Sequence, residues 1–493
     1  MIKDIAIVLD CGATNVRCIA MDSQGQIVAS KSAPNETDAD ALCPDGRIWD
    51  LEKLWGKLCN ASKEVISAID TQRIAGVTVT TFGVDGALVD EAGKLLYPVI
   101  SWQCPRTAPI MENIGKYIPL EKLYHTTGVY PYNFNTINKL IWLKENQPEL
   151  IKSAHRFLFI PSLLIHKLSG AFVNDASMLG TSMFSDLSTR KPSAEVLEAI
   201  GIDEALFGEI GEAGQQVGMV NEQAFSETGI PTGTPVLLAG HDTQFAIFGS
   251  GAEFNQPVLS SGTWEILMAR SKSCRTTSEE LQQQLTTELD AIAGGFNIGQ
   301  NWLGSGVLEW FSKNFYPELK GNELYEQMIS DAEAVLPGCE GVSVDAAFHN
   351  DGANIEGGAI KGLTIATTRA QIYRAFLESL ACRLRESLEI LEKAGEFKAE
   401  SIICVGGGSK NRLWNQLRAN ICQVPIHLIE QKETTVLGAS LFVFAGTKVF
   451  DTIEAARQNV LGKQQVITPD STQKELWEQL YQQYVESKKQ STC

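Results

Sequence analysis

The first thirty residues alternate between apolar runs and turn-forming residues. Residues 5–9 form an unbroken apolar run, which is typical of a strand buried on both faces. Residues 10–15 favour a turn, residues 16–21 return to β-forming types, and residues 23–25 favour a second turn. The pattern therefore predicts a strand, a loop and a second strand in this segment.

Two later segments repeat this layout of strand, small-residue turn and strand. One covers residues 74–99, with Gly83 and Asp85 in a first turn and a tight turn at residues 91–93. The other covers residues 257–269. The repeat is weak as sequence similarity but clear as a pattern. Because a duplicated loop can hold one ligand from two sides, we expect two related halves.

Helical periodicity separates the β-rich segments. Apolar residues recur at helical spacing in three stretches, and a polar helix is expected near the end of the chain: residues 51–69, 136–145, 372–393 (ended by Gly395) and 474–489. The resulting order is β-rich, helical, β-rich, helical. This order predicts an α/β fold with two domains and a cleft between them.

A domain boundary is expected where an apolar strand pattern, residues 235–239, runs into several glycines between positions 240 and 251. Glycine permits hinge motion at such a point. We therefore expect one domain over residues 1–245 and a second over residues 246–493, the second with a helical tail.

Charge narrows the possible partners. The chain has 493 residues, a formal net charge of -18 and a pI near 4.9. An acidic surface repels phosphate backbones, so nucleic acid is not expected as a partner. Any phosphate site must instead be local and built from backbone amides, helix N-termini and a metal ion.

Other features indicate a cytoplasmic protein that does not enter membranes. No run of about 18 apolar residues occurs, which excludes an obvious membrane-spanning helix. Asp4 and Asp10 interrupt the first apolar stretch, unlike the core of a secretory signal. The 11 cysteines are scattered without a CxxC pair, which favours reduced thiols over disulfides or a zinc site.

The loop at residues 10–15 is the first candidate phosphate site, since the sequence holds neither a Walker A motif nor a Rossmann fingerprint. Gly12 and Ala13 let a phosphate approach the backbone. The side chains of Thr14 and Asn15 can donate hydrogen bonds and Arg17 adds positive charge, while Asp10 can face a hydrated Mg²⁺. An ordinary hairpin turn explains the same residues.

Two more loops have suitable chemistry. Gly262 and Thr263 repeat the first loop's chemistry in the second half of the chain. The triple glycine at residues 406–408 follows an apolar strand pattern, so Gly407 and Gly408 can leave a flat surface for a purine, with Asn411 or Asn415 reaching the ribose or base. A tight turn between a strand and a helix is the alternative interpretation.

In this order the loops resemble those of the FGGY carbohydrate kinases. Residues 134–146, FNTINKLIWLKEN, fit the first signature of that family throughout. Residues 358–378 fit the second signature except at Phe376. The stretches TTFGVDGALVD, AGHDTQFAIFG, LSSGTWEIL and VGGGSKNRLWNQLRAN extend the resemblance over residues 5–445.

The resemblance implies a ribonuclease-H-like, actin-like ATPase fold in each domain, ATP and Mg²⁺ as cofactors, and phosphoryl transfer to a ketose hydroxyl. Within the family the chain is most similar to members that phosphorylate L-fuculose, and next to those that phosphorylate L-rhamnulose. Many relatives carry an aspartate where this chain has Cys104. A cysteine there would suit a deoxy sugar, which presents a methyl group instead of a hydroxyl.

Asp242 is the candidate general base. On pattern alone, an N-cap of the helix that begins at Thr243 explains it equally well. The segment Gly240-His241-Asp242 matches the catalytic segment of the family, and the resemblance implies that Asp242 also helps Asp10 to hold the metal ion.

The resemblance also implies a set of sugar-binding residues: Gly83, Asp85, Trp102, Arg106, His241, Thr243 and Asn297. For three of them a structural role is the alternative. Asp85 can stabilise its own turn, Trp102 can belong to the core, and Arg106 can form a salt bridge within a loop.

Other functions compete with the L-fuculose kinase. L-Rhamnulose, D-ribulose and D-xylulose are alternative ketoses, because the sequence does not show stereochemistry. An actin-like or Hsp70-like ATPase that acts on a protein partner would share the phosphate loops, yet would not need Asp242 or the turn at Gly83. The oligomeric state does not follow from the sequence.

Overall fold

The computed structural model describes residues 3–350, 355–429, 431, 433–460, 462 and 464–491. Its chain divides into two compact units, each assembled from three separate stretches. The first unit comprises Met1–Gly251, Lys272–Asn297 and Glu433–Leu461. The second comprises Ala252–Ser271, Ile298–Lys432 and Gly462–Cys493.

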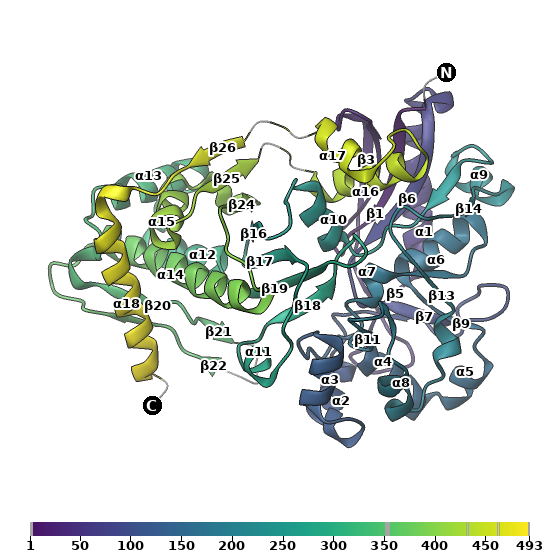
Figure 1. The fold of residues 1–493 in the computed structure, drawn as a ribbon, viewed down its shortest axis with the longest axis horizontal. Helices are drawn as coiled ribbons and strands as arrows, with labels where there is room; N and C mark the ends of the chain where they lie inside the picture. Colours follow the sequence, from purple (N-terminus) through teal and green to yellow (C-terminus); the bar gives the residue numbers. More distant parts are fainter. Residues whose placement is uncertain are drawn as a thin grey trace. The chain divides into compact units, whose positions relative to one another are not determined.

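The first unit is built on a mixed sheet with the strand order β14-β15-β6-β1-β2-β3 (Figure 1). Its strands are β1 (Ile5–Cys11), β2 (Asn15–Asp22), β3 (Ile27–Pro34), β6 (Ile74–Thr81), β14 (Gln216–Met219) and β15 (Pro235–Leu237). Strands β1, β2 and β3 pair antiparallel, whereas β6 is parallel to both β1 and β15. Because β1 is central, its residues are apolar on both faces.

The two faces of this sheet are covered by different helices. Ile5, Ile7 and Leu9 belong to the core cluster that contains α1 (Leu51–Ser67) and α6 (Ile160–Ser169). Val8 packs instead with α10 (Asp242–Gly249) and α16 (Thr434–Gly446). Because side chains alternate along a strand, Asp10 falls on the same face as Val8, the face of α10 and α16.

The remaining elements of the first unit form small sheets and surface helices. The strands of the small sheets are β4 (Asp38–Ala39), β5 (Arg47–Trp49), β7 (Gly86–Val89), β8 (Val99–Ile100), β9 (Arg156–Phe159), β10 (Val173–Asp175), β11 (Ser185–Asp186), β12 (Lys191–Pro192) and β13 (Glu209–Gly211). Strand β18 (Thr286–Leu289) also belongs to the first unit but to none of these small sheets. The helices are α2 (Ala108–Glu112), α3 (Leu120–Thr127), α4 (Thr136–Asn146), α5 (Pro148–Ser153), α7 (Ala176–Leu179), α8 (Ala194–Ile200), α9 (Glu222–Thr228), α11 (Ser278–Gln282) and α17 (Ile453–Val460).

The sheet of the second unit runs in the order β19-β17-β16-β24-β25-β26 over the residues of that unit. These strands are β16 (Pro257–Ser261), β17 (Trp264–Ser271), β19 (Phe296–Leu303), β24 (Ile402–Val405), β25 (Ile426–Ile429) and β26 (Gln464–Ile467). Strand β16 is antiparallel to β17 and parallel to β24, which is parallel to β25. Two small two-stranded sheets pair β20 (Ser343–Asp345) with β23 (Ala359–Lys361) and β21 (His349–Asn350) with β22 (Ile355–Glu356).

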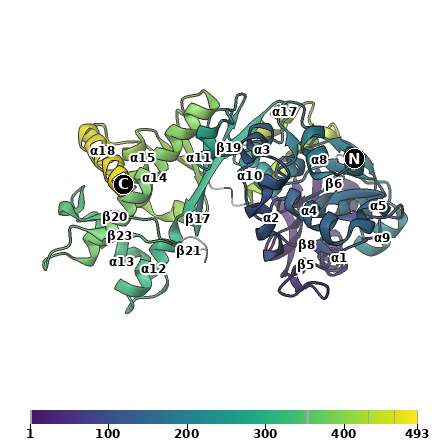
Figure 2. The same ribbon diagram turned by 90° about the horizontal axis from the view of Figure 1, so that it is seen from below.

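Helices pack on this second sheet and on each other. They are α12 (Ser305–Phe315), α13 (Gly321–Glu333), α14 (Arg369–Gly395), α15 (Arg412–Cys422) and α18 (Lys474–Ser491). The polar helix α18 lies beside α14 and α15 in both views (Figures 1 and 2). Helix α14 ends at Gly395, as the sequence predicts, and Glu396 after it takes the left-handed conformation, with φ 55°.

Both units share one topology. In each, the first strand is flanked by the second and third on one side and by two parallel strands on the other: β3-β2-β1-β6-β15 and β19-β17-β16-β24-β25. This order, with its antiparallel start and parallel continuation, confirms the α/β class with two ribonuclease-H-like domains. No helix in the described ranges is both long and apolar enough to cross a membrane.

One predicted strand–turn–strand unit is arranged differently. Strand β6 does not pair with β7, because β6 pairs with β1 and β15 while β7 pairs with β9. The turn at residues 82–85 therefore sends the chain from the large sheet into a separate two-stranded one. The predicted turn at residues 91–93 does fold the chain back, since Val89 forms an antiparallel bridge with Leu95.

Helices α10 and α16 touch through their backbones. A Cβ added to Gly438 would lie 2.0 Å from the carbonyl oxygen of Phe245, and one on Gly249 would lie 1.9 Å from that of Thr434. No side chain fits between helices at this distance, so two glycines allow α16 to cover α10 (Figure 1).

We expect Gly438→Ala to lower the free energy of unfolding by about 1–3 kcal/mol, because the new methyl group must push the helices apart. The matched control is Gly56→Ala in α1, where an added Cβ meets nothing within 4 Å. That change should raise stability by about 0.5–1 kcal/mol through helix propensity. Urea denaturation measures both, and equal stability of the two variants would contradict the packing argument.

Candidate active site

Asp10 stands at the end of β1 and is nearly buried. Its Oδ1 accepts a hydrogen bond from the hydroxyl of Thr80 on β6 at 2.8 Å. Its Oδ2 accepts two from Arg17, at 2.9 Å from Nε and 2.6 Å from Nη2. Asp10 and Arg17 are paired residues on neighbouring strands, which fixes this contact by register.

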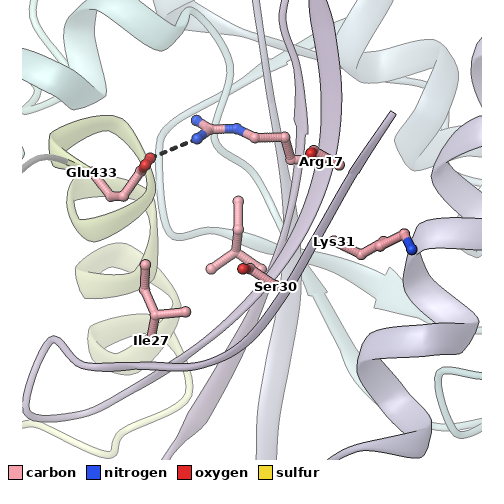
Figure 3. A pocket seen from close by; sticks show the side chains of 7 residues that line it. Arg17, Ile27, Ser30, Lys31 and Glu433 are labelled. Carbon is pink, nitrogen blue, oxygen red and sulfur yellow. Dashed lines mark hydrogen bonds and ion pairs between the residues drawn. The ribbon is translucent and has the colours of Figure 1, made fainter. Parts of the chain in front are cut away.

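The other end of the Arg17 guanidinium meets a residue from the far end of the chain. Nη1 donates to Glu433 at 2.7 Å, just before α16, as Figure 3 shows. The pair borders a groove of about 480 Å³ along β2 and β3. Lys31 also lines this groove, but its ammonium group points away from Arg17 and pairs with Glu64 on α1. Burial lowers the pKa of Arg17, but Asp10 and Glu433 outweigh this effect and raise it, so the guanidinium stays charged.

The loop between β1 and β2 is anchored by its backbone, and its side chains are open to solvent. Gly12 N donates to Asn15 O at 2.9 Å, and Asn35 holds Gly12 O through its side chain at 2.9 Å. The side chains of Thr14 and Asn15 are exposed, and Ala13 is partly so. The loop therefore offers donors to a ligand without having to unfold.

Asp242 opens α10 as its first residue, and the N-cap position belongs to His241. Its Oδ1 accepts from Thr243 N at 2.7 Å, and 33% of its side chain is exposed. Burial raises the pKa of Asp242, and Asp10 raises it further against the pull of His241 and Thr243. A carboxylate with a raised pKa and a solvent-exposed edge can accept a proton from a bound hydroxyl.

His241 lies between two carboxylates. Its Nε2 is 3.5 Å from Asp242 Oδ1, and its Nδ1 is 3.4 Å from Glu288 Oε2 on β18. Burial lowers the pKa of His241, but Glu288, Asp242 and Asp175 together raise it above its ordinary value.

A buried polar support holds the Gly240–Asp242 turn. His241 N donates to the hydroxyl of Ser177 at 2.9 Å, and that hydroxyl donates to Asp175. A Cβ on Gly240 would lie 2.0 Å from Asp175 Oδ1, so only glycine fits there. Burial raises the pKa of Asp175 to about 7. Thr81 N also donates to Gly240 O at 2.9 Å, which joins the turn to the end of β6.

The turn after β6 is strained and firmly held. Val84, a β-branched residue, has φ 65°, a conformation that costs on the order of 1–3 kcal/mol. Its N–H donates to Thr181 Oγ1 at 3.0 Å, and its carbonyl accepts from Thr136 at 2.7 Å and Lys139 at 3.1 Å. A Cβ on Gly83 would lie 3.0 Å from His241 Nε2, so this turn and the Gly240–Asp242 turn are neighbours.

Asp85 is fully buried and has three partners. It forms an ion pair with Lys139 and accepts from Trp49 Nε1 at 2.7 Å and Trp102 N at 3.1 Å. Its carboxylate thus ties the turn at Gly83 to the segment of Trp102. The Trp102 ring is partly exposed and packs edge-on against Phe134.

Arg106 is also buried, with 3% of its side chain exposed. It pairs with Asp40 at 2.5 Å, donates to Tyr97 at 3.1 Å and to the sulfur of Cys104, and lies over the ring of Trp142. Cys104 is itself buried. In this conformation both residues act on a ligand only through the loop that they support.

Asn297 lies next to α10 but is completely buried. Its Nδ2 donates to Gln244 and, at 3.0 Å, to Asp290. It therefore reaches the neighbourhood of Asp242 through Gln244.

In the second unit, Gly262 and the exposed Thr263 form the loop between β16 and β17. A buried ion pair of Arg418 with Glu265 lies beneath them, and Ser261 donates to Glu265 at 2.9 Å. Trp302 completes the site by donating to Glu265 at 3.0 Å.

The triple-glycine segment lies against the same loop, because β24 is parallel to β16 with Val405 opposite Ser260. A Cβ on Gly408 would lie 2.0 Å from Ser261 Oγ, whereas one on Gly407 would meet nothing within 4 Å. The backbone at Gly407 is therefore open to a flat ligand. Asn411 caps α15 through Trp414 N at 3.0 Å, and Asn415 is fully buried between Arg418 and Ser409.

The first unit thus gathers most of the predicted residues, namely Asp10, Gly12, Ala13, Thr14, Asn15, Arg17, Gly83, Asp85, Trp102, Arg106, His241, Asp242, Thr243 and Asn297. The second holds Gly262, Thr263, Gly407, Gly408, Asn411 and Asn415. No group of three or more His, Cys, Asp or Glu suited to a metal ion occurs within the described ranges.

Sequence reasoning missed several partners. Lys139 has a local signal, because a lysine stands on the buried face of a helix next to Thr136 and Leu140. Glu433 and Glu288 have none, because their partners Arg17 and His241 are distant in the chain.

Comparison with known proteins gives a consistent result. Residues 5–249 match the N-terminal domain, and residues 258–446 the C-terminal domain, of the FGGY family of carbohydrate kinases. The chain is 45% identical over 460 residues to L-fuculokinase of Escherichia coli (strain K12), covering 93% of this chain and 96% of that protein. It is 29% identical over 397 residues to a rhamnulokinase of Bacteroides thetaiotaomicron, covering 79% and 80%. The crystal structure of xylulose kinase from Rhodospirillum rubrum superimposes with a TM-score of 0.88 over 98% of each chain at 21% identity.

We expect Ser177→Ala to lower kcat about tenfold to a hundredfold, because it leaves the buried His241 N–H without its acceptor and lets the turn move. The matched control is Ser185→Ala, since the buried Ser185 hydroxyl has no hydrogen-bond partner among the described residues. Sugar-dependent ADP release measures both variants. Equal kcat values for the two would show that Ser177 does not support the turn.

Proposed function

Because the chain belongs to the FGGY family of carbohydrate kinases, we propose that it transfers the γ-phosphoryl group of ATP to L-fuculose and forms L-fuculose 1-phosphate. The observation that carries the proposal is Asp242. Its partly exposed carboxylate lies at the start of α10, near the turn at residues 82–85 and near Asp10. Burial and Asp10 raise the pKa of Asp242.

In this reaction Asp242 acts as the general base. It accepts the proton of the attacking hydroxyl as the bond to the γ-phosphorus forms and the bond to the β,γ-bridging oxygen breaks. A raised pKa suits this step, because a base whose pKa lies closer to the working pH holds the transferred proton more strongly.

Each unit carries loops whose chemistry suits one part of ATP. Gly12, Ala13, Thr14 and Asn15 present backbone and side-chain donors to the phosphates, as do Gly262 and Thr263. Arg17 contributes charge while it holds Asp10 in place. The open backbone at Gly407 receives the adenine, while Gly408 packs on Ser261, and Asn411 and Asn415 support this turn.

Asp10 and Asp242 fit a magnesium ion. Both carboxylates lie on the α10 face of the sheet, and Asp10 raises the pKa of Asp242, so the two negative charges interact. Carboxylate oxygens with retained waters are the ligands that Mg²⁺ prefers. The bound ion would neutralise the charge that develops on the transferred phosphoryl group.

The sugar site comprises Gly83, His241 and Thr243 beside Asp242, with Trp102 as an apolar wall. Asp85, Arg106 and Asn297 contribute through the loops and side chains that they hold, since each is buried. Near full-length similarity to L-fuculokinases supports L-fuculose over L-rhamnulose, D-ribulose and D-xylulose.

A coupled ADP-release assay across these four ketoses tests the function. We expect L-fuculose to give the highest kcat/KM, and Asp242→Asn to lower kcat about a hundredfold or more through loss of the base. ADP release that no ketose stimulates would contradict the kinase and favour an ATPase that acts on another partner. Near-normal turnover of Asp242→Asn would refute only the role of Asp242.

The raised pKa of Asp242 predicts that its charge, which catalysis needs, lowers the stability of the fold. With EDTA present, Asp242→Asn should unfold at higher urea than wild type at pH 7, because a folded-state pKa above the unfolded value means that the charged form is disfavoured by folding. As the pH falls through that pKa the wild-type carboxyl is neutralised, so the difference should vanish below about pH 4.

Asp186→Asn is the control of opposite sign. Burial raises the pKa of Asp186, but hydrogen bonds from Ser188 and Thr189 outweigh it and lower the pKa. Its charge therefore stabilises the fold at pH 7, and its replacement should lower the urea midpoint. A gain that persists for Asp242→Asn at pH 4 would refute the argument.

A further inference from the structure

The segment Lys272–Asn297 belongs to the first unit, although the chain on both sides of it belongs to the second. It is anchored on either side of Glu288. Thr287 N donates to Gly128 O at 2.8 Å, and Tyr124 OH donates to Leu285 O at 2.7 Å. Arg190 Nη2 donates to Asp290 O at 3.0 Å. The 272–297 segment therefore holds Glu288 in a fixed place.

Glu288 faces the first turn of α10, which carries Asp242. Its Oε2 accepts from Gln244 Nε2 at 2.6 Å and lies 3.4 Å from His241 Nδ1. Gln244 is fully buried, and only 15% of the Glu288 side chain is exposed. Burying a carboxylate to this extent costs free energy unless polar partners compensate it. Here the partners are His241, the N-cap of α10, and Gln244 in the first turn of that helix.

We propose that Glu288 is a positioning residue for the ketose site, an inference that rests on the proposed function. Glu288 faces Nδ1 of His241 and thereby turns Nε2 towards the Gly83 turn and Asp242. The 3.4 Å approach is an electrostatic contact, because Nδ1 makes no hydrogen bond within the described ranges. An imidazole with a carboxylate beside one nitrogen presents its other nitrogen on the opposite side. Glu288 thus sets how His241 meets a sugar hydroxyl.

The same carboxylate extends its influence to Asn297. Gln244 donates to Glu288 with its amide nitrogen and accepts from Asn297 with its amide oxygen, and Asn297 also donates to Asp290 at 3.0 Å. The orientation of the Gln244 amide is therefore set from the Glu288 side. Loss of Glu288 would leave Gln244 without its acceptor and His241 without the facing carboxylate, while Asn297 would keep its bond to Asp290.

Steady-state kinetics of Glu288→Ala and Glu288→Gln test the proposal. With L-fuculose varied at saturating ATP, Glu288→Ala should raise the KM for the sugar about tenfold to a hundredfold, as expected for a lost hydrogen bond to a charged group. The KM for ATP should stay within about twofold, because the side-chain contacts of Glu288 within the described ranges are with Gln244 and His241. Glu288→Gln should lie between, since its amide oxygen still accepts from Gln244.

Glu279→Gln is the matched control, an exposed carboxylate of α11 on the same segment whose partner is Arg275. It should keep wild-type values for both substrates. A merely structural role of Glu288 would change both KM values or kcat alone, and either result would overturn the proposal. If Glu288→Ala does not fold, Glu288→Gln decides by the same split between sugar and ATP.

A double-mutant cycle with His241→Asn adds a second criterion. If Glu288 acts through His241, Glu288→Gln should raise the sugar KM much less in the His241→Asn background than in wild type. Additive effects would overturn the route through His241. A wild-type enzyme that no ketose stimulates would instead refute the proposed function, so the two failures are distinguishable.

Discussion

The guanidinium of Arg17 is the interaction on which the rest of the site depends. It joins a carboxylate at the end of the first strand, Asp10, to a carboxylate at the start of a late helix, Glu433. Without a cation here, two negative charges would meet at a partly buried place, next to the third charge of Asp242. The positive charge of Arg17 also explains how a protein with a net negative charge can bind phosphate. A local arginine and backbone amides take the place of a basic surface.

In both units, buried polar residues support the loops, and exposed polar residues are available to a ligand. The buried pairs Asp85–Lys139, Arg106–Asp40 and Arg418–Glu265 each lie beneath a loop whose outer residues remain open. Buried ion pairs add little to net stability, but removing one partner leaves an uncompensated charge. Such ion pairs can fix the conformation of a loop. The turn supported by Asp85 and Lys139 is strained, because Val84 takes a left-handed conformation.

The sequence predicted what is encoded locally. Apolar runs located β1, β15 and β24, helical spacing located α1, α4 and α14, and small residues marked the loops at Gly12, Gly262 and Gly407. What depends on contacts between distant segments was not visible. The burial of Asp85, Arg106 and Asn297 follows from partners elsewhere in the chain, and so does the pairing of β7 with β9 rather than β6. No pattern near residue 433 shows that it meets Arg17.

The interleaved order of the two units affects how the protein is made. Ala6 and Val8 of β1 pack with residues of α16, which is synthesised only after most of the second unit. During translation this apolar face of the first sheet therefore lacks the part of its cover that α16 supplies, although its strands and α10 are already made. A nascent chain with such a surface is prone to association and to binding by chaperones. Because α16 completes the cover of the first sheet, the first unit can finish folding only late in translation.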